Sequence, residues 1–211
     1  AWDNKQMDTV QALMPTLKDY PLYPYLEYRQ ITDDLMNQPT VTVNNFIQAN
    51  PTLPPARTLK SRFVNELARR EDWRGLLAFS PDKPGATEAQ CNYYYAKWAT
   101  GQQEEAWVGA KELWLTGKSQ PNACDPLFSA WRASGKQDPL SYLERIRLAM
   151  KAGNTRLVTV LAGQMPADYQ TIASAVISLA NDPNTVLTFA RTTGATDFTR
   201  QMAAVAFASV A

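Results

Sequence analysis

Acid–base or nucleophilic chemistry in this chain would depend on carboxylates, lysines, tyrosines or two cysteines, because its 211 residues include no histidine. That absence excludes a Ser-His-Asp triad, a Cys-His dyad and a zinc site with histidine ligands. It also removes the commonest general acid or base near neutral pH. The sequence has no phosphate-binding loop, dinucleotide fingerprint or metal-ligand spacing. We therefore expect no cofactor and no bound metal.

Three pairs of adjacent carboxylates are the remaining candidates for catalysis: Asp33-Asp34, Glu71-Asp72 and Glu104-Glu105. Neighbouring residues on a helix point about 100° apart, so the two members of a pair do not face each other. Surface positions explain these charges more simply, and the Glu104-Glu105 pair suits the first turn of a helix. We expect no catalytic residue among them.

Aromatic side chains gather in three places: residues 20–28, residues 93–98, and the Trp107/Trp114 pair. Aromatic faces can stack on sugar rings or seat a protein partner. Packing between layers of helices is the simpler interpretation for most of them. The candidates for contact with a glycan or a partner are Tyr23, Tyr25, Tyr94 and Trp98.

The charge and hydropathy of the chain argue against nucleic acid and membranes as partners. The chain has 21 Lys and Arg against 20 Asp and Glu, so its formal net charge is +1. Such a balance gives no general attraction to nucleic acid or to an acidic membrane surface. No apolar run reaches the ~18 residues that a membrane-spanning helix needs. We expect neither a nucleic-acid partner nor a membrane span.

The two cysteines, Cys91 and Cys124, are 33 positions apart and form no Cys-x-x-Cys motif. From the residues alone, two buried thiols and one disulfide are both possible. A disulfide would imply an oxidising compartment.

The elements that position these side chains are expected to be helices. Asp125, Asp138 and Asp182 each precede a proline, a pattern typical of a helix start. Thr87 with Gln90 fits a capping box. Apolar residues recur at helical spacing in four stripes. These stripes are Ala106/Ala110/Leu113, Leu143/Ile146/Met150, Ile172/Val176/Leu179 and Phe198/Met202/Val205. The one short stretch that alternates like a strand is 40–43.

Helices are joined by tight turns in a recurring way. One segment ends at Gly101 and another at Gly153, where a left-handed residue is needed, and a new helix follows each time. The segment 67–75 is a looser copy that lacks the glycine. These hairpins resemble degenerate tetratricopeptide units of irregular period. We predict an all-α fold, an irregular α-solenoid of about a dozen helices. A globular bundle is the alternative, although bundles favour longer helices.

Four strings of residues resemble the soluble lytic murein transglycosylases of enteric bacteria. They are KDYPLYPYLEYRQ (18–30), NPTLPPAR (50–57), EDWR (71–74) and AQCNYYYA (89–96). The similarity runs along essentially the whole chain. In that family a superhelical, U-shaped domain of short helices comes first, a linker domain closes it into a ring, and a lysozyme-like catalytic domain is last.

The resemblance implies an activity for a longer protein. The family cleaves the β-1,4 bond between N-acetylmuramic acid and N-acetylglucosamine in peptidoglycan and leaves a 1,6-anhydromuramic end. The catalytic glutamate of the family precedes a serine, and none of the eight glutamates here does so. Residues 1–211 are therefore expected to be part of one superhelical U-shaped domain, without the linker and catalytic domains.

The role expected for this chain is architectural. It would help to form the ring and could guide glycan strands, with peptidoglycan and the rest of the polypeptide as its partners. The alternative is a protein-interaction solenoid that docks other cell-wall enzymes. The family is periplasmic, which implies a periplasmic location and favours a Cys91–Cys124 disulfide.

Overall fold

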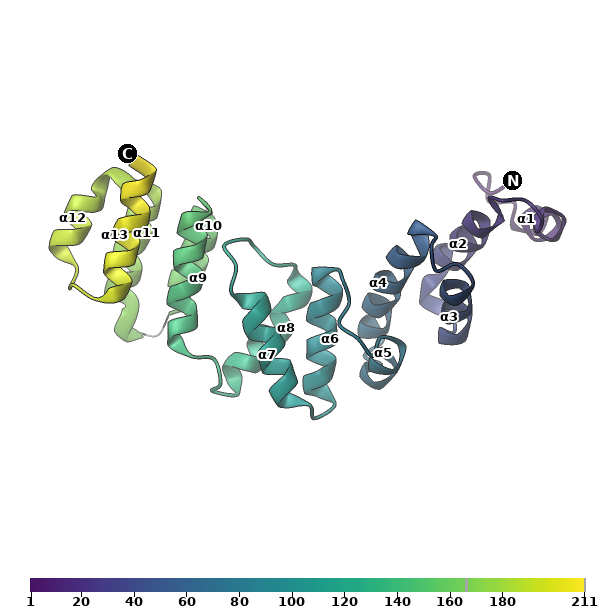
Figure 1. Cartoon of the computed structure of the whole chain (residues 1–211), viewed down its shortest axis with the longest axis horizontal. Helices are drawn as coiled ribbons and strands as arrows, with labels where there is room; N and C mark the ends of the chain where they lie inside the picture. The colour runs from purple at the N-terminus through teal and green to yellow at the C-terminus, as the bar shows by residue number, and fades with distance from the viewer. Residues whose placement is uncertain (166, 211) are drawn as a thin grey trace. The chain divides into compact units, whose positions relative to one another are not determined.

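The structure is a computed structural model that describes residues 1–165 and 167–210, with the side chain of Pro139 outside this description. Over these residues the chain forms thirteen α-helices and no strand. Figure 1 labels these helices along the chain. The prediction of an all-α fold with about a dozen short helices is therefore confirmed. The chain divides into two compact units, residues 1–100 and residues 101–211. The prediction that the whole chain is part of one U-shaped domain stays a prediction.

The first unit contains six helices, and buried residues of α2 to α6 form one apolar core. They are α1 (Met7–Leu13), α2 (Tyr23–Asp33), α3 (Thr40–Ala49), α4 (Pro54–Arg69), α5 (Trp73–Phe79) and α6 (Thr87–Ala99). The long helix α4 is central, since it contacts α2, α3, α5 and α6. Its side chains Leu59, Phe63 and Val64 are fully buried. Phe63 meets Phe79 of α5 edge to face, with ring centroids 4.9 Å apart.

The second unit contains seven helices. They are α7 (Gln103–Trp114), α8 (Asp125–Ala133), α9 (Pro139–Lys151), α10 (Thr155–Gly163), α11 (Gln170–Asn181), α12 (Val186–Thr192) and α13 (Asp197–Val210). Helices α9, α10 and α11 pack in chain order, and α13 returns to contact α9. Within each unit, most contacts join helices that are close along the chain, which is the local pattern of an α-solenoid.

Segment 40–43 illustrates how burial decides the element type. Its alternating residues resemble a strand, but they form the first turn of α3. Val43 and Phe46 lie three positions apart on this helix and both are buried. The apolar positions therefore follow the 3.6-residue period of a helix once residues 46 and 47 are included.

Two of the turns that join helices have the same geometry. Between α9 and α10, Gly153 has a φ of 67°, and the amide of Asn154 donates to Ala149 O at 2.9 Å. Between α4 and α5, Glu71 has a φ of 56°, and the amide of Asp72 donates to Leu67 O at 2.9 Å. This bond across five residues is the mark of a Schellman turn.

The residue after each left-handed position starts the next helix. The Asp72 side chain accepts from Gly75 N at 2.9 Å, and the Asn154 side chain accepts from Leu157 N at 3.1 Å. The looser copy predicted around residues 67–75 is thus the same turn as its counterpart at Gly153. Glutamate simply occupies the place of the glycine.

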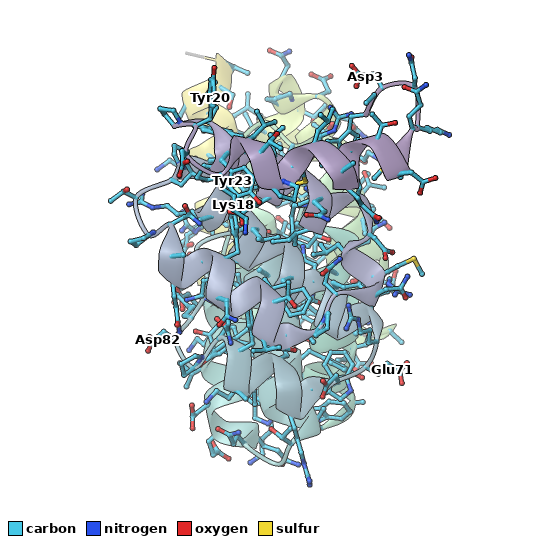
Figure 2. All side chains as sticks on the ribbon, turned by 90° about the vertical axis from the view of Figure 1, so that its right-hand side faces the viewer. Asp3, Lys18, Tyr20, Tyr23, Glu71 and Asp82 are labelled. Carbon is cyan, nitrogen blue, oxygen red and sulfur yellow. The ribbon has the colours of Figure 1, made fainter. Side chains whose placement is uncertain are left out.

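Replacing Glu71 with glycine is expected to raise the free energy of unfolding by about 0.5–1 kcal/mol, because a left-handed φ strains a residue that has a Cβ. Urea unfolding would measure the gain. The converse change, Gly153→Ala, is expected to lower stability by about 1 kcal/mol. A loss of stability in Glu71→Gly would contradict this account, since Glu71 is exposed and projects outward in Figure 2.

Two of the helix-start predictions are right and two are wrong. The Asp138 carboxylate accepts from Leu140 N at 2.8 Å, and the Asp182 carboxylate accepts from Asn184 N at 3.1 Å, where it starts a 3-10 turn. Asp125 instead lies inside α8, because the 3-10 turn Asn122–Cys124 runs directly into that helix. The capping box at Thr87 is also wrong: α6 begins at Thr87 itself, and Gln90 donates to Pro84 O at 2.8 Å.

Glu66 forms the best-defined ion-pair group in the first unit. Its carboxylate lies 2.7 Å from Arg69 Nη2 and 2.9 Å from Arg70 Nε, one turn further along α4. The hydrogen bonds from Arg69, aided by those from Arg70 and by both positive charges, lower the pKa of Glu66 from 4.5 to about 2. Burial of the carboxyl group opposes this shift only in part.

Replacing Glu66 with glutamine is expected to cost about 1 kcal/mol of stability at neutral pH, since its arginine partners are partly solvated. A lowered pKa contributes stability above pH 4.5, and that contribution disappears as the pH falls from 4.5 to about 2. Urea unfolding across this range, with exposed Glu88→Gln as the control, would test the sign. An undiminished difference at pH 2 would contradict it.

Both cysteines are disulfide-bonded, and the chain has no others. The predicted Cys91–Cys124 disulfide is therefore confirmed. Each of the two side chains is fully buried. None of the described helices is long and apolar enough to cross a membrane.

Candidate functional site

The predicted contact residues Tyr23 and Tyr25 lie in the first turn of α2. Tyr25 is 45% exposed, whereas Tyr23 is half-buried. Tyr20, just before the helix, is 66% exposed and projects from the surface in Figure 2. The rigid turn around Pro21 and Pro24 therefore presents one half-buried and two exposed tyrosine rings.

The other predicted pair, Tyr94 and Trp98, lies on α6, and both side chains are half-buried. Trp98 packs against Tyr95 with ring centroids 5.0 Å apart, and Tyr95 packs against Trp73 of α5 at 4.9 Å. We call Trp73, Tyr95 and Trp98 the aromatic row. Tyr94 is not in the row, because its ring meets that of Tyr93 at 5.2 Å.

Among the described residues of the first unit, ring contacts join Trp98 to Tyr95 and Trp73, and Tyr94 to Tyr93. The structure adds Trp73 and Tyr95 to Trp98. The sequence predicted the 93–98 group but missed Trp73, which is distant along the chain and adjacent to Tyr95 only because α5 packs on α6.

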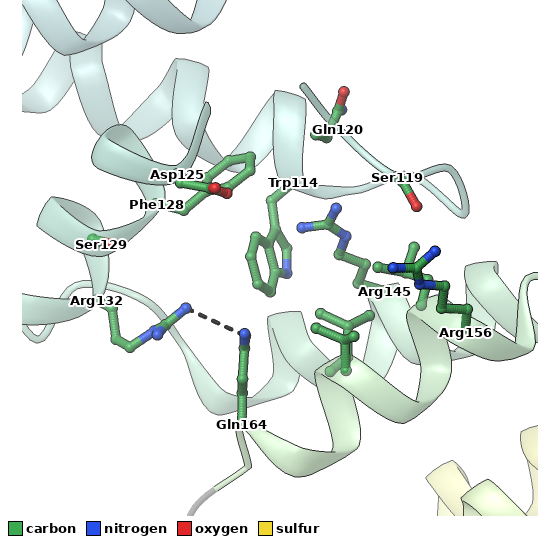
Figure 3. A pocket seen from close by; sticks show the side chains of 13 residues that line it. Trp114, Ser119, Gln120, Asp125, Phe128, Ser129, Arg132, Arg145, Arg156 and Gln164 are labelled. Carbon is green, nitrogen blue, oxygen red and sulfur yellow. Dashed lines mark hydrogen bonds between the residues drawn. The ribbon is translucent and has the colours of Figure 1, made fainter. Parts of the chain in front are cut away.

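A pocket of about 390 Å³ lies in the second unit, between the end of α7, the segment before α8, and helices α8, α9 and α10. Its inner wall is made by the buried side chains of Trp114, Phe128, Arg145 and Leu161. Figure 3 shows Arg145 beside the Trp114 ring, with Arg132 and Arg156 at other parts of the wall. The volume is within the range of small-molecule sites.

Trp114 is the centre of an aromatic cluster. It meets Phe128 and Tyr142 at 5.0 Å and Trp131 at 6.3 Å, in each case edge to face. Its indole nitrogen donates to Ser141 O at 3.0 Å. These contacts hold the ring at the junction of α7, α8 and α9.

Arg145 is the most unusual side chain of the pocket, because a charged group with only 4% exposure is rare. Its guanidinium carbon lies 4.2 Å from the Trp114 ring centroid and 5.5 Å from that of Phe128. Burial lowers the pKa of Arg145 to about 10, an effect that the Tyr142 and Asp125 charges only partly offset. The guanidinium therefore remains charged at neutral pH.

The pocket contains more positive than negative charge. Arg132, Arg145 and Arg156 line it together with one carboxylate, that of Asp125. Within the part of the chain that the structure describes, none of the three arginines forms an ion pair with a carboxylate. Arg145 Nε is buried without a hydrogen-bond partner. Arg132 donates a long bond of 3.5 Å to Gln164, drawn as a dashed line in Figure 3, and its guanidinium carbon lies 5.7 Å from the Tyr142 ring centroid.

The segment between α7 and α8 is held firmly at the edge of this pocket. Gln120 donates to Leu113 O at 2.5 Å, and Asn154 donates to Gly117 O at 3.2 Å. A Cβ at Gly117 would lie 2.2 Å from Leu148 O, so only glycine permits this close approach to α9. The segment is thereby fixed against α9 and the start of α10.

The sequence prediction did not find this pocket. One signal was present: Tyr142, Arg145, Ile146 and Ala149 follow the spacing of a buried helix face, and all four are buried. An arginine within such a stripe indicates a buried guanidinium. The residues that surround it lie on α7, α8 and α10. The sequence did not predict that these helices pack together.

Arginine partners lower the pKa of several carboxyl groups in the described residues. A glycosidase-type acid needs a raised pKa so that it is protonated near neutral pH. Three carboxyl groups have displaced pKa values, those of Asp3, Glu66 and Glu144, and every one of them is lowered by an arginine. In the described residues, groups of three or more potential metal ligands are also absent.

No protein-family model matches the sequence. Individual relatives do. The chain is 90% identical over all 211 residues to the soluble lytic murein transglycosylase of Escherichia coli strain K12, and 85% identical to that of Salmonella typhimurium. In both comparisons the alignment covers 100% of this chain and 33% of the relative. The chain therefore spans about a third of the length of these relatives.

Solved structures of lytic transglycosylases are also similar to this chain. The crystal structure of the 70-kDa soluble lytic transglycosylase from Escherichia coli matches 100% of this chain with a TM-score of 0.95 and 90% identity, over 34% of that chain. An inactive mutant of the lytic transglycosylase Slt from Pseudomonas aeruginosa matches 93% of this chain with a TM-score of 0.83 and 31% identity, over 32% of that chain.

Proposed function

We propose that this chain is the non-catalytic helical scaffold of a peptidoglycan-cleaving enzyme, because it is 90% identical over its whole length to part of a soluble lytic murein transglycosylase. The observation that carries the proposal is the 90% identity over the whole chain to a protein three times as long. The longer protein would cleave the bond between N-acetylmuramic acid and N-acetylglucosamine and leave a 1,6-anhydromuramic end. This chain would contribute architecture and guide glycan strands.

A non-catalytic role is supported by the acidic residues. None of the eight glutamates precedes a serine. The carboxyl groups with displaced pKa values are shifted in the direction opposite to that of a general acid.

Guidance of glycan strands is supported by the aromatic row in the first unit. Its members Trp73, Tyr95 and Trp98 are half-buried, so each ring is held by packing and keeps part of its surface in solvent. A rigid, partly exposed aromatic face is suited to stacking on a sugar ring. Periplasmic location would agree with the disulfide, since disulfides persist in that compartment.

The purified chain is expected to release no anhydromuropeptides from peptidoglycan sacculi. Mass spectrometry of the soluble products would measure this, with a full-length relative as the positive control. Release by this chain free of other enzymes would overturn the proposal that it is non-catalytic.

Replacing Trp98 with alanine is expected to weaken binding of the chain to soluble glycan strands about fivefold, from the loss of one stacking face. Co-sedimentation or calorimetry would measure the change. The matched control is Phe207→Ala, which removes a ring that is 50% exposed in the second unit. No glycan binding, together with specific capture of periplasmic proteins, would instead favour an interaction solenoid.

A further inference from the structure

We infer that the pocket of the second unit is a binding site for a small peptide-like anion, held by its carboxylate on the arginines Arg132, Arg145 and Arg156. We call it the arginine pocket. The inference does not depend on whether the longer protein cleaves murein. It rests on charge, burial and the shape of the wall.

The first argument is the unpaired charge of Arg145. Removing a guanidinium from water is costly unless an anion or several acceptors replace the water. Arg145 is 4% exposed, yet its Nε has no partner and no ion pair involves its guanidinium within the described residues. The Trp114 and Phe128 rings compensate in part through cation–π contact. An anion in the pocket would supply the missing interaction.

The second argument is the surplus of positive charge at the rim. Arg132 and Arg156 are exposed side chains on α8 and α10, and both line the same pocket as Arg145. Against three arginines there is one carboxylate, that of Asp125, so the pocket carries net positive charge. Guanidinium groups bind carboxylates through two parallel hydrogen bonds, which makes them selective for planar oxyanions.

The third argument selects a carboxylate with an apolar body over an inorganic ion. One wall of the arginine pocket is formed by Leu157, Val160 and Leu161 of α10. Val160 is 48% exposed there, although it is an aliphatic side chain. A volume of about 390 Å³ is much larger than a phosphate ion needs. A short peptide that ends in a small apolar residue would place its carboxylate on the arginines and its side chain on this wall.

The rim also offers groups for the peptide backbone. Ser119, Ser129 and Gln164 line the pocket with polar side chains that can donate or accept. Together these features match the recognition of a free C-terminal carboxylate, in which charge gives affinity and the apolar wall gives selectivity.

The test uses the whole 211-residue chain and two acetylated dipeptides, acetyl-Ala-Ala in the L and D forms, each with a free C-terminus. Calorimetry would measure affinity, and the indole NMR signal of Trp114, assigned through Trp114→Phe, would report occupancy. We expect binding of at least one form. Replacing Arg156 with glutamine should weaken it about tenfold, because a charge-assisted hydrogen bond is lost. Arg132→Gln should act in the same direction.

The matched control is Arg191→Gln, an exposed arginine on α12 outside the pocket, which should leave the affinity unchanged. The C-terminal amides of the same dipeptides should bind at least tenfold more weakly. Equal affinity for acid and amide, no effect of Arg156→Gln, or tighter binding of inorganic phosphate than of either peptide would each overturn the proposal.

Discussion

Replacing Trp114 with alanine is expected to lower the free energy of unfolding of the second unit by about 4 kcal/mol, near the upper end of the range for large-to-small changes in a core. Trp114 is 2% exposed, and its ring touches Phe128, Trp131 and Tyr142. Removing it leaves a cavity where α7, α8 and α9 meet. It also removes the nearer aromatic face over the Arg145 guanidinium, which would then be buried with less compensation.

Urea unfolding followed by near-ultraviolet circular dichroism would measure this loss. Trp114→Phe keeps an aromatic ring but removes the hydrogen bond from Nε1 to Ser141 O, so it is expected to cost about 1–2 kcal/mol. Val108→Ala on the same helix is the surface control, since Val108 is 70% exposed. It should change stability by less than about 0.5 kcal/mol. Equal losses for Val108→Ala and Trp114→Ala would contradict the role given to the aromatic cluster.

Removing the disulfide by the double change Cys91→Ala and Cys124→Ala is expected to cost about 3.7 kcal/mol in the chain-entropy model. The cross-link closes a loop of about 34 residues, so its loss increases the freedom of the unfolded chain. Both sulfur atoms are fully buried, and alanine keeps these positions apolar. Thermal and urea unfolding would measure the effect.

Reductant gives an independent check of the same prediction. Dithiothreitol should destabilise the original chain by a similar amount and leave the double variant unchanged. Intact-mass measurement after alkylation should show two modified thiols only in reduced protein. Two alkylatable thiols in the native, non-reduced chain would refute the disulfide.

The arginine pocket shows what a pattern of neighbouring residues cannot predict. The sequence predicted Leu143, Ile146 and Met150 as the apolar stripe of α9, whereas the structure buries Tyr142, Arg145, Ile146 and Ala149, so the burial of Arg145 was missed. Its partners could not be inferred, because Trp114 is 31 residues before Arg145, and Arg132 and Arg156 lie on two other helices. Contacts of that kind depend on how helices pack.

For the aromatic candidates too, one part was predictable from the sequence and another was not. The cluster at 93–98 was recognisable from composition, but its pairing was not. Tyr95, rather than Tyr94, joins Trp98 to Trp73, because α5 packs on that side of α6. In the described structure, the rings of Tyr23 and Tyr25 do not contact the rings of this row. The Trp98→Ala experiment tests whether the aromatic row meets glycan.

The sequence by itself determined the helical class, the turns at Gly101 and Gly153, the Asp138 cap and the absence of histidine chemistry. These features depend on interactions within a few residues, such as a left-handed φ or a capped amide, which a local pattern expresses directly. Tertiary structure alone decided that Arg145 is buried against Trp114 beside two other arginines. The burial and charge of that site arise from side chains on four helices, and their distances exist only after packing.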